Sequence, residues 1–213
     1  MIMSAKEVGP APLSPRGEQS RQWILRAASE LLAETGELEV ASVALRAKVS
    51  VGLPYRYFGS KSGLLSVLVD DFHTRLAEAV VYRDFPGATW QEREQQRVSE
   101  WVRFLFSESL APVMLVGLGG DATVAASWQR RLSLAVDRGA RNIARGQRDG
   151  DLPKAADPTI LAAAVLGGVQ AAVAVALASS PRPAQAKVAR SLWSFVRGAV
   201  EYQAPRASGP RHV

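Results

Sequence analysis

The chain has 213 residues, a formal net charge of +6 and no cysteine. The lack of cysteine excludes a disulfide framework, thiol catalysis and thiolate metal sites. The only histidines are His73 and His212, which nearly excludes a multi-histidine metal site and most histidine-based general-base schemes. The sequence also lacks a nucleophile–histidine pair, paired catalytic carboxylates and a phosphate-binding loop. We therefore predict that the protein is not an enzyme and uses neither a metal nor a cofactor.

The two ends of the chain differ in composition from the rest. Residues 1–19 include three prolines and two glycines and lack the continuous apolar core of a signal peptide. They predict a disordered arm on a cytoplasmic protein. Residues 204–213, with two prolines and two arginines, predict a flexible tail.

Between these ends the pattern predicts helices throughout. Apolar residues recur at helical spacing, and period-2 runs bounded by hairpin turns are lacking, so the fold class is all-α with about nine helices. The predicted helices are, in chain order, 20–35, 40–48, 52–58, one from Ser60 to a break at 84–87, 89–108, a short one opened by Pro112, 121–148, 158–180 and 184–203.

The segment 160–178 has the length of a membrane span and carries no charge. Eight of its 19 residues are alanine and two are glycine, so its transfer free energy into lipid is weak compared with that of a Leu-rich span. Small residues also allow another helix to approach closely. We favour a buried helix at a helix–helix or subunit interface, with a membrane-anchored protein as the alternative.

A window without acidic residues lies between Glu39 and Asp70, and it holds four of the basic residues. Two short predicted helices in this window, 40–48 and 52–58, follow an amphipathic first helix, as in a helix-turn-helix unit. Such a unit places its second helix in the major groove of DNA, with phosphate contacts on either side. Hydroxyl and basic side chains in this window suit those contacts.

A run of residues across the same window resembles one protein family. Ala27-Ala28 and Leu31-Leu32 precede Gly36, Val43-Ala44 precedes Ala47 and Val49-Ser50, and Tyr55-Arg56-Tyr57-Phe58-Gly59-Ser60-Lys61 precedes Leu64-Leu65. Over residues 21–65 the chain thereby resembles the DNA-binding region of TetR-family transcriptional regulators. The resemblance implies a helix-turn-helix domain at 20–65 and a larger helical ligand-binding and dimerisation domain at 66–203.

The resemblance also implies which residues of the first domain contact double-stranded DNA. The expected phosphate contacts are Ser42, Ser50, Tyr55, Tyr57 and Lys61. The expected base contacts are Val51, Gly52, Leu53 and Arg56. The chain departs from the family pattern at two places, since Lys48 occupies the turn where glycine is usual, and Leu53-Pro54 precedes the tyrosine. We expect a positive φ at Lys48 and a helix that starts near Gly52, so that Pro54 falls in its first turn.

For the second domain the resemblance implies a homodimer on a palindromic operator, repressing transcription until a small, largely apolar ligand releases it. The expected pocket residues are Trp101, Met114, Trp128 and Gln170. The last two helices would pack against their symmetry mates through Leu166, Val169, Val173, Leu192 and Phe195. Arg138, Arg141, Arg145 and Arg148 form a basic stripe, which we interpret as a solvated face. The alternative function is a helical small-molecule carrier or enzyme-like binding protein without a DNA role.

Overall fold

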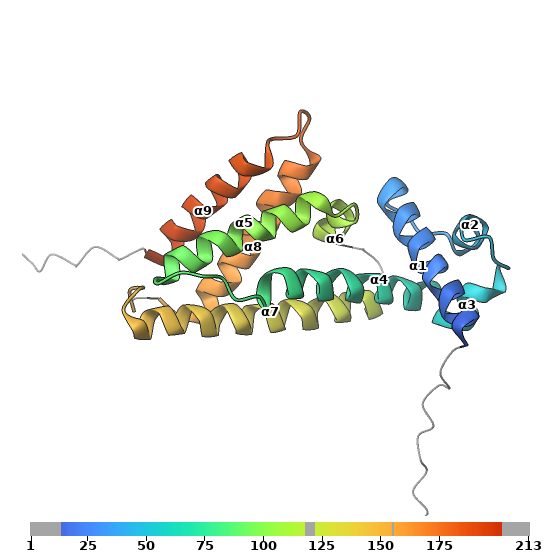
Figure 1. Ribbon diagram of the computed structural model, residues 1–213, viewed down its shortest axis with the longest axis horizontal. Coiled ribbons are helices and arrows are strands. Elements are labelled where there is room, and N and C mark those ends of the chain that lie inside the picture. The colour runs from blue at the N-terminus through green and yellow to red at the C-terminus, as the bar shows by residue number, and fades with distance from the viewer. Residues whose placement is uncertain (1–13, 118–121, 155, 202–213) are drawn as a thin grey trace, which may run out of the picture. The chain divides into compact units, whose positions relative to one another are not determined.

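The computed structural model describes residues 14–117, 122–154 and 156–201 (Figure 1). Within these ranges the chain forms nine α-helices, one π-helical turn and no strand, as the all-α prediction requires. The chain divides into two units, residues 1–68 and 69–213. This boundary falls three residues after the predicted one. Most of the predicted arm and almost all of the predicted tail lie outside the described residues.

Unit 1 contains α1 (Pro15–Thr35), α2 (Val40–Arg46), α3 (Gly52–Phe58) and the start of α4 (Lys61–Leu76). The expectation of disorder as far as residue 19 is wrong for its last residues, because α1 begins at Pro15. The Ser14 hydroxyl accepts a hydrogen bond from Gly17 N at 3.2 Å, and proline suits the first helical turn. The core of the unit is apolar and includes Ile24, Ala28, Leu32, Val43, Ala44 and Leu64.

Unit 2 contains the rest of α4, the π-helical turn η1 (Ala77–Val81) and five further helices: α5 (Trp90–Ser107), α6 (Ala111–Val116), α7 (Ala122–Asp149), α8 (Pro158–Ala178) and α9 (Gln185–Glu201). Helix α8 packs against α7, α6, α9 and α5, and α5 also packs along α9. The most completely buried side chains of this core include Phe72, Val102, Leu105, Val169 and Val173.

Helix α8 starts as the sequence predicts, because the Asp157 carboxylate accepts hydrogen bonds from Thr159 N and Ile160 N, and Pro158 follows it. In the described part of the chain it is the one helix long and apolar enough to cross a membrane by length and composition. Core helices of soluble proteins also meet that criterion.

The two faces of α8 have different environments. One face, which includes Val169 and Val173, is buried in unit 2. The opposite face is exposed although it is apolar, with Ile160, Ala164, Gly167, Ala171 and Val175 in helical register. We call these five residues the α8 stripe.

Three predicted dimer contacts are therefore wrong. Val169, Val173 and Leu192 are at most 5% exposed and belong to the core of their own subunit. The sequence of α8 is apolar on every side, so its periodicity could not indicate which face points inward. Phe195 on α9 is 44% exposed and remains available to a partner.

Candidate DNA-binding surface and ligand cavity

The turn between α2 and α3 has the conformation that the sequence predicts. Lys48 has φ +54°, and it is the one non-glycine residue with positive φ in the described ranges. The turn is closed by a hydrogen bond from Val49 N to Ala44 O at 3.0 Å. Helix α3 begins at Gly52, so Pro54 lies in its first turn, where a missing N–H costs little, and its ring is buried.

The expected DNA contacts lie on the outer side of this helix-turn-helix. Val51 is 55% exposed, Tyr55 48%, and the side chain of Lys61 50%. Ser42, Ser50, Gly52 and Arg56 are exposed as well, while Leu53 and Tyr57 are half-buried. Tyr57 meets Phe58 edge to face, with ring centroids 6.3 Å apart. The Ser60 hydroxyl accepts a hydrogen bond from Gly63 N at 3.0 Å and so caps α4, whose first residue is Lys61.

Two of the four basic residues in the acid-free window, Arg46 and Lys61, are paired within unit 1. Arg46 donates two hydrogen bonds of 2.8 Å to the carboxylate of Glu34, and these hydrogen bonds lower the pKa of Glu34. Lys61 lies 3.6 Å from the carboxylate of Glu39. Sequence reasoning missed the Arg46 pair because its acid lies outside the window, on α1. Lys48 and Arg56 make no ion pair within the described residues.

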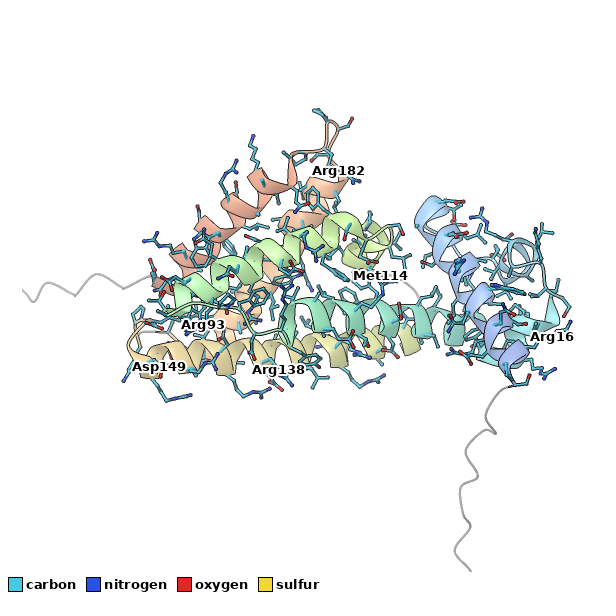
Figure 2. All side chains as sticks on the ribbon, viewed as in Figure 1. Arg16, Arg93, Met114, Arg138, Asp149 and Arg182 are labelled. Carbon is cyan, nitrogen blue, oxygen red and sulfur yellow. The ribbon has the colours of Figure 1, made fainter. Side chains whose placement is uncertain are left out.

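Unit 2 encloses a cavity of about 510 Å³ between α4, η1, α5, α7, α8 and α9. Of the predicted pocket residues, Trp101, Trp128 and Gln170 line it. Met114 does not, because it is buried on α6 (Figure 2). Leu166, predicted at the dimer interface, lines this cavity instead.

One end of the cavity is formed by aromatic and aliphatic side chains. The rings of His73 and Trp128 pack edge to face, with centroids 4.8 Å apart, and Leu132 lies one turn further along α7. Nδ1 of His73 lies 2.8 Å from Val69 O, which fixes the ring. Burial lowers the pKa of His73, so the imidazole is neutral near pH 7.

The cavity lining also includes seven arginines but only two acids, Asp84 and Glu94. Glu94 is 8% exposed and accepts hydrogen bonds of 2.9 Å from Arg97 Nε and from Asn142 Nδ2. Arg131 pairs with Asp70 at 3.1 Å, outside the lining. The negative charge of Glu94 is thus already compensated by the protein.

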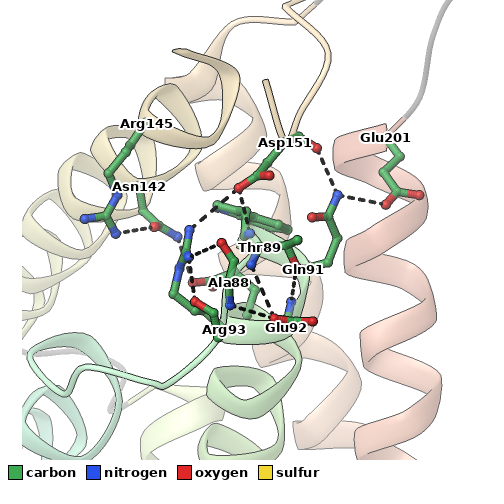
Figure 3. A network of polar contacts seen from close by, with 12 residues as sticks. Ala88, Thr89, Gln91, Glu92, Arg93, Asn142, Arg145, Asp151 and Glu201 are labelled. Carbon is green, nitrogen blue, oxygen red and sulfur yellow. Dashed lines mark hydrogen bonds and ion pairs between the residues drawn. The ribbon is translucent and has the colours of Figure 1, made fainter. Parts of the chain in front are cut away.

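The basic stripe of α7 lies at this cavity. Arg138, labelled in Figure 2, stacks on the ring of Tyr82, with its guanidinium carbon 4.4 Å from the centroid. Arg145 donates to Asn142 Oδ1 at 3.3 Å (Figure 3). Arg138, Arg141, Arg145 and Arg148 form no ion pair with the acids that the structure describes. All four side chains are exposed, as the interpretation of a solvated face expects, and the sequence did not show that they also line a cavity.

The first turn of α5 is anchored at the same end of the cavity. Trp90 N donates to Asp151 Oδ2 at 2.8 Å, and Gln91 Nε2 donates to Asp151 O at 2.9 Å and to Glu201 Oε1 at 3.3 Å (Figure 3). Thr89 and Glu92 complete a capping box. These bonds fix the position of the Trp90 side chain.

Two indole N–H groups of the cavity lining lack an acceptor. Trp90 and Trp101 are 2% and 8% exposed, and Nε1 of each is buried without a hydrogen-bond partner. A buried donor without an acceptor is costly and rare. The described residues contain no cluster of His, Asp and Glu that could hold a metal ion.

An exposed helix-turn-helix is the arrangement of a DNA-binding domain, and the same chain carries a helical unit with a cavity. Residues 24–68 match the model of the family described as "Bacterial regulatory proteins, tetR family". This match confirms the resemblance for residues 24–68, which form a DNA-binding helix-turn-helix like those of that family. No curated protein matches the chain in sequence.

Several solved structures of transcriptional regulators share the fold of this chain. FadR from Bacillus subtilis, solved with stearoyl-CoA, is 19% identical, with a TM-score of 0.69 over 84% of this chain and 99% of that one. SmeT, the repressor of the Stenotrophomonas maltophilia multidrug efflux pump SmeDEF, is 22% identical, with a TM-score of 0.68 over 91% and 96%. NalD, the secondary repressor of the MexAB-OprM multidrug efflux pump in Pseudomonas aeruginosa, is 18% identical, with a TM-score of 0.68 over 86% and 98%.

Proposed function

We propose that the protein is a cytoplasmic repressor that binds a palindromic operator as a homodimer and is released by a small ligand in the cavity of unit 2. The observation that carries the DNA role is the exposed surface at α3 and its N-cap, where the side chains of Val51, Tyr55 and Arg56 lie outside the unit 1 core. Arg56 has the planar guanidinium that reads guanine or clamps phosphate, and Lys61 suits a phosphate oxygen.

The homodimer is supported by the α8 stripe. Ile160 and Val175 are each 69% exposed, and Ala164, Gly167 and Ala171 form a flat surface between them. Phe195 of α9 lies against Gly168 of α8 and extends this apolar surface. Exposed apolar surface of this kind marks a protein contact, and two copies related by a two-fold axis would bury it. A two-fold dimer in turn implies an operator with two-fold symmetry.

Release by a ligand is supported by the cavity itself, whose volume and apolar walls suit a small molecule. FadR was solved with stearoyl-CoA, and SmeT and NalD are repressors, so both properties occur on this fold. A ligand acts only if it binds better to the form that has low affinity for DNA. Helix α4 carries both Lys61 and the cavity residue His73, so one helix takes part in both functions.

The test is selection of bound DNA from a random pool by the full-length protein, followed by measurement of its affinity for the selected site at several salt concentrations. The double variant Lys61→Ala with Tyr55→Phe should lose affinity at least tenfold while its circular dichroism and dimerisation stay unchanged. Lys187→Ala, at an exposed position of α9, is the control for loss of one positive charge. A protein that shows no preference for any DNA sequence would be a carrier, the alternative function.

A further inference from the structure

The four stripe arginines have a position that the helix dipole does not explain. Cations stabilise the last turn of a helix, which accounts for Arg148 next to the end of α7 at Asp149. Arg138 and Arg141 lie two or three turns earlier, where this effect has faded. They lie three residues apart on one face, without an acid between them, and therefore repel each other. Both line the cavity of unit 2.

Two contacts between α5 and α7 locate the unpartnered Trp90 indole at this basic end. A β-carbon at Gly146 would lie 2.8 Å from Trp90 Cδ1, so the indole lies on α7 between Arg145 and Arg148 in sequence. One turn further along α5, Glu94 accepts from Asn142. The two helices thus run antiparallel, and the Trp90 N–H lies near the arginines rather than near Trp128.

The opposite end of the cavity is apolar. Trp128 and Arg145 are 17 residues apart on one helix, which corresponds to about 25 Å along its axis. Trp128, Leu132 and Ala135 line the cavity from the first part of α7, and Trp101 lines it from α5. The cavity is therefore elongated along α7. Its walls are mainly apolar at one end, where the Trp101 N–H is the unpartnered donor, and the other end holds the Trp90 N–H and the exposed stripe arginines, which form no ion pair with the acids that the structure describes.

From this arrangement we propose that the ligand of unit 2 is an amphipathic anion, whose apolar body lies between Trp101, Trp128 and Leu132. Its carboxylate or phosphate group lies among Arg141, Arg145 and the indole N–H of Trp90. Arginine, a planar donor without acceptor capacity, and the indole, which can only donate, both require an acceptor. A cationic ligand would face seven arginines and only two acids, Asp84 and Glu94, of which Glu94 is already paired with Arg97. This assignment rests on the proposed ligand-sensing role of the cavity.

The test compares head groups on the same chain. Saturated carboxylates of 8 to 14 carbons, each with the alcohol, primary ammonium and phosphate monoester of equal length, are titrated calorimetrically into the full-length protein without DNA, below their micelle concentrations. At the best chain length we expect the carboxylate or the phosphate monoester to bind at least tenfold more tightly than the alcohol, and the ammonium most weakly. The two anions distinguish the carboxylate from the phosphate as the natural head group.

Variants separate the head-group site from the apolar walls. In the double variant Arg141→Gln with Arg145→Gln, the preference for the anion over the alcohol should fall to less than threefold while the affinity for the alcohol is kept. Trp90→Phe should reduce the same preference. Arg130→Gln, on the same helix but outside the cavity, is the control and should change neither.

The proposal is overturned if the alcohol or the ammonium binds as tightly as the anions, or if no member of the series binds. It is also overturned if Arg130→Gln reduces the preference for the anion over the alcohol as much as the double variant does. Because no DNA is present, these outcomes are independent of the operator experiment. An anion that binds without releasing DNA would overturn the release mechanism and leave the ligand class intact.

Discussion

Gly146 of α7 allows the Trp90 indole to lie directly against the helix backbone, and an added β-carbon would come within 2.8 Å of Trp90 Cδ1. It would also come within 3.0 Å of Leu152 Cδ1. The hydrogen bond from Trp90 N to Asp151 Oδ2 anchors the backbone at Trp90, so the indole has little freedom to move away from α7. A glycine in the middle of a 28-residue helix is thus explained by packing.

Gly146→Ala should therefore destabilise the protein. Overpacking in a core costs about 1–3 kcal/mol, and the better helix propensity of alanine offsets only about 1 kcal/mol of it. Gly198→Ala on α9 is the control, because nothing lies within 4 Å of its β-carbon, and it should be neutral or stabilising. The measurement is urea unfolding followed by circular dichroism. Equal stability of the two variants would contradict the close approach at Trp90.

Lys48 has a backbone conformation that suits glycine. Lys48→Gly should be more stable than Lys48→Ala by about 1 kcal/mol, because only glycine adopts a positive φ without steric cost. Both variants remove the same charge, so their difference reports backbone strain alone. The decrease in DNA affinity that both variants show relative to the parent reports the contribution of the Lys48 charge to DNA binding. Thermal unfolding and DNA titration of the three proteins give both quantities, and an alanine variant as stable as the glycine variant would contradict the strain.

The neutral state of His73 makes stability depend on pH. Burial lowers its pKa below the ordinary value of 6.5, so the unfolded chain takes up a proton more readily than the folded one. The corresponding stability is present above about pH 6.5 and is lost as the pH falls through the lower folded-state pKa. Asp70 and Arg131 are the charged groups that act on the ring.

His73→Gln should lose less stability between pH 7.5 and pH 5.5 than the parent, because glutamine does not titrate. Urea unfolding at both pH values measures this difference. His212 lies outside the described residues, and His212→Gln serves as the control, with the pH dependence of the parent. Identical pH dependence of the parent and His73→Gln would show that the ring is not the responsible group.

Arg56 and Lys61 should have different roles on DNA. Lys61→Gln should weaken binding to all sequences alike, and it should reduce the slope of log affinity against log salt by about 0.9 for each phosphate that Lys61 neutralises in the parent. Arg56→Gln should relax the preference at one base pair of each half-site, at a cost of about 1–3 kcal/mol for the preferred base. Affinities for the selected operator and its single-base variants, at two salt concentrations, separate the two roles. Equal decreases in affinity on all sequences for both variants would assign Arg56 to phosphate.

The α8 stripe gives a prediction for assembly. Ala171→Arg places a charge on the exposed stripe without touching the core of unit 2, so it should yield folded monomers with greatly weakened binding to the palindrome. Ala125→Arg, at an exposed alanine on α7, should remain dimeric. Sedimentation velocity measures the association state. A dimeric Ala171→Arg variant would place the interface elsewhere.

Most helices could be predicted from the sequence because their signals are local. The Asp157-Pro158 start of α8 and the Gly36 end of α1 are examples, and the positive φ of Lys48 followed from its place in a known turn. Ser14-Pro15 is an equally good start signal for α1, but the surrounding prolines and glycines concealed it.

The site residues divide along the same line. The exposed surface of α3 follows from a short sequence run, so its residues were identified together. The orientation of α8 depends on its neighbours, so Val169 was assigned to the wrong face. The position of the arginine stripe and of Trp90 depends on how α5 and α7 pair, which is tertiary information. The pocket prediction was accordingly incomplete, with Trp101 at the cavity and Met114 away from it.

The anchoring of α5 affects the order of folding. Trp90 and Asp151 are 61 residues apart in the chain, and Gln91 and Glu201 are 110 residues apart, whereas the Arg46–Glu34 pair of unit 1 spans 12. Long separations slow the formation of contacts. On the ribosome, the residues of unit 1 emerge together and can close their core early. The first turn of α5 has to wait for almost the entire chain, so we expect unit 1 to complete its core before unit 2.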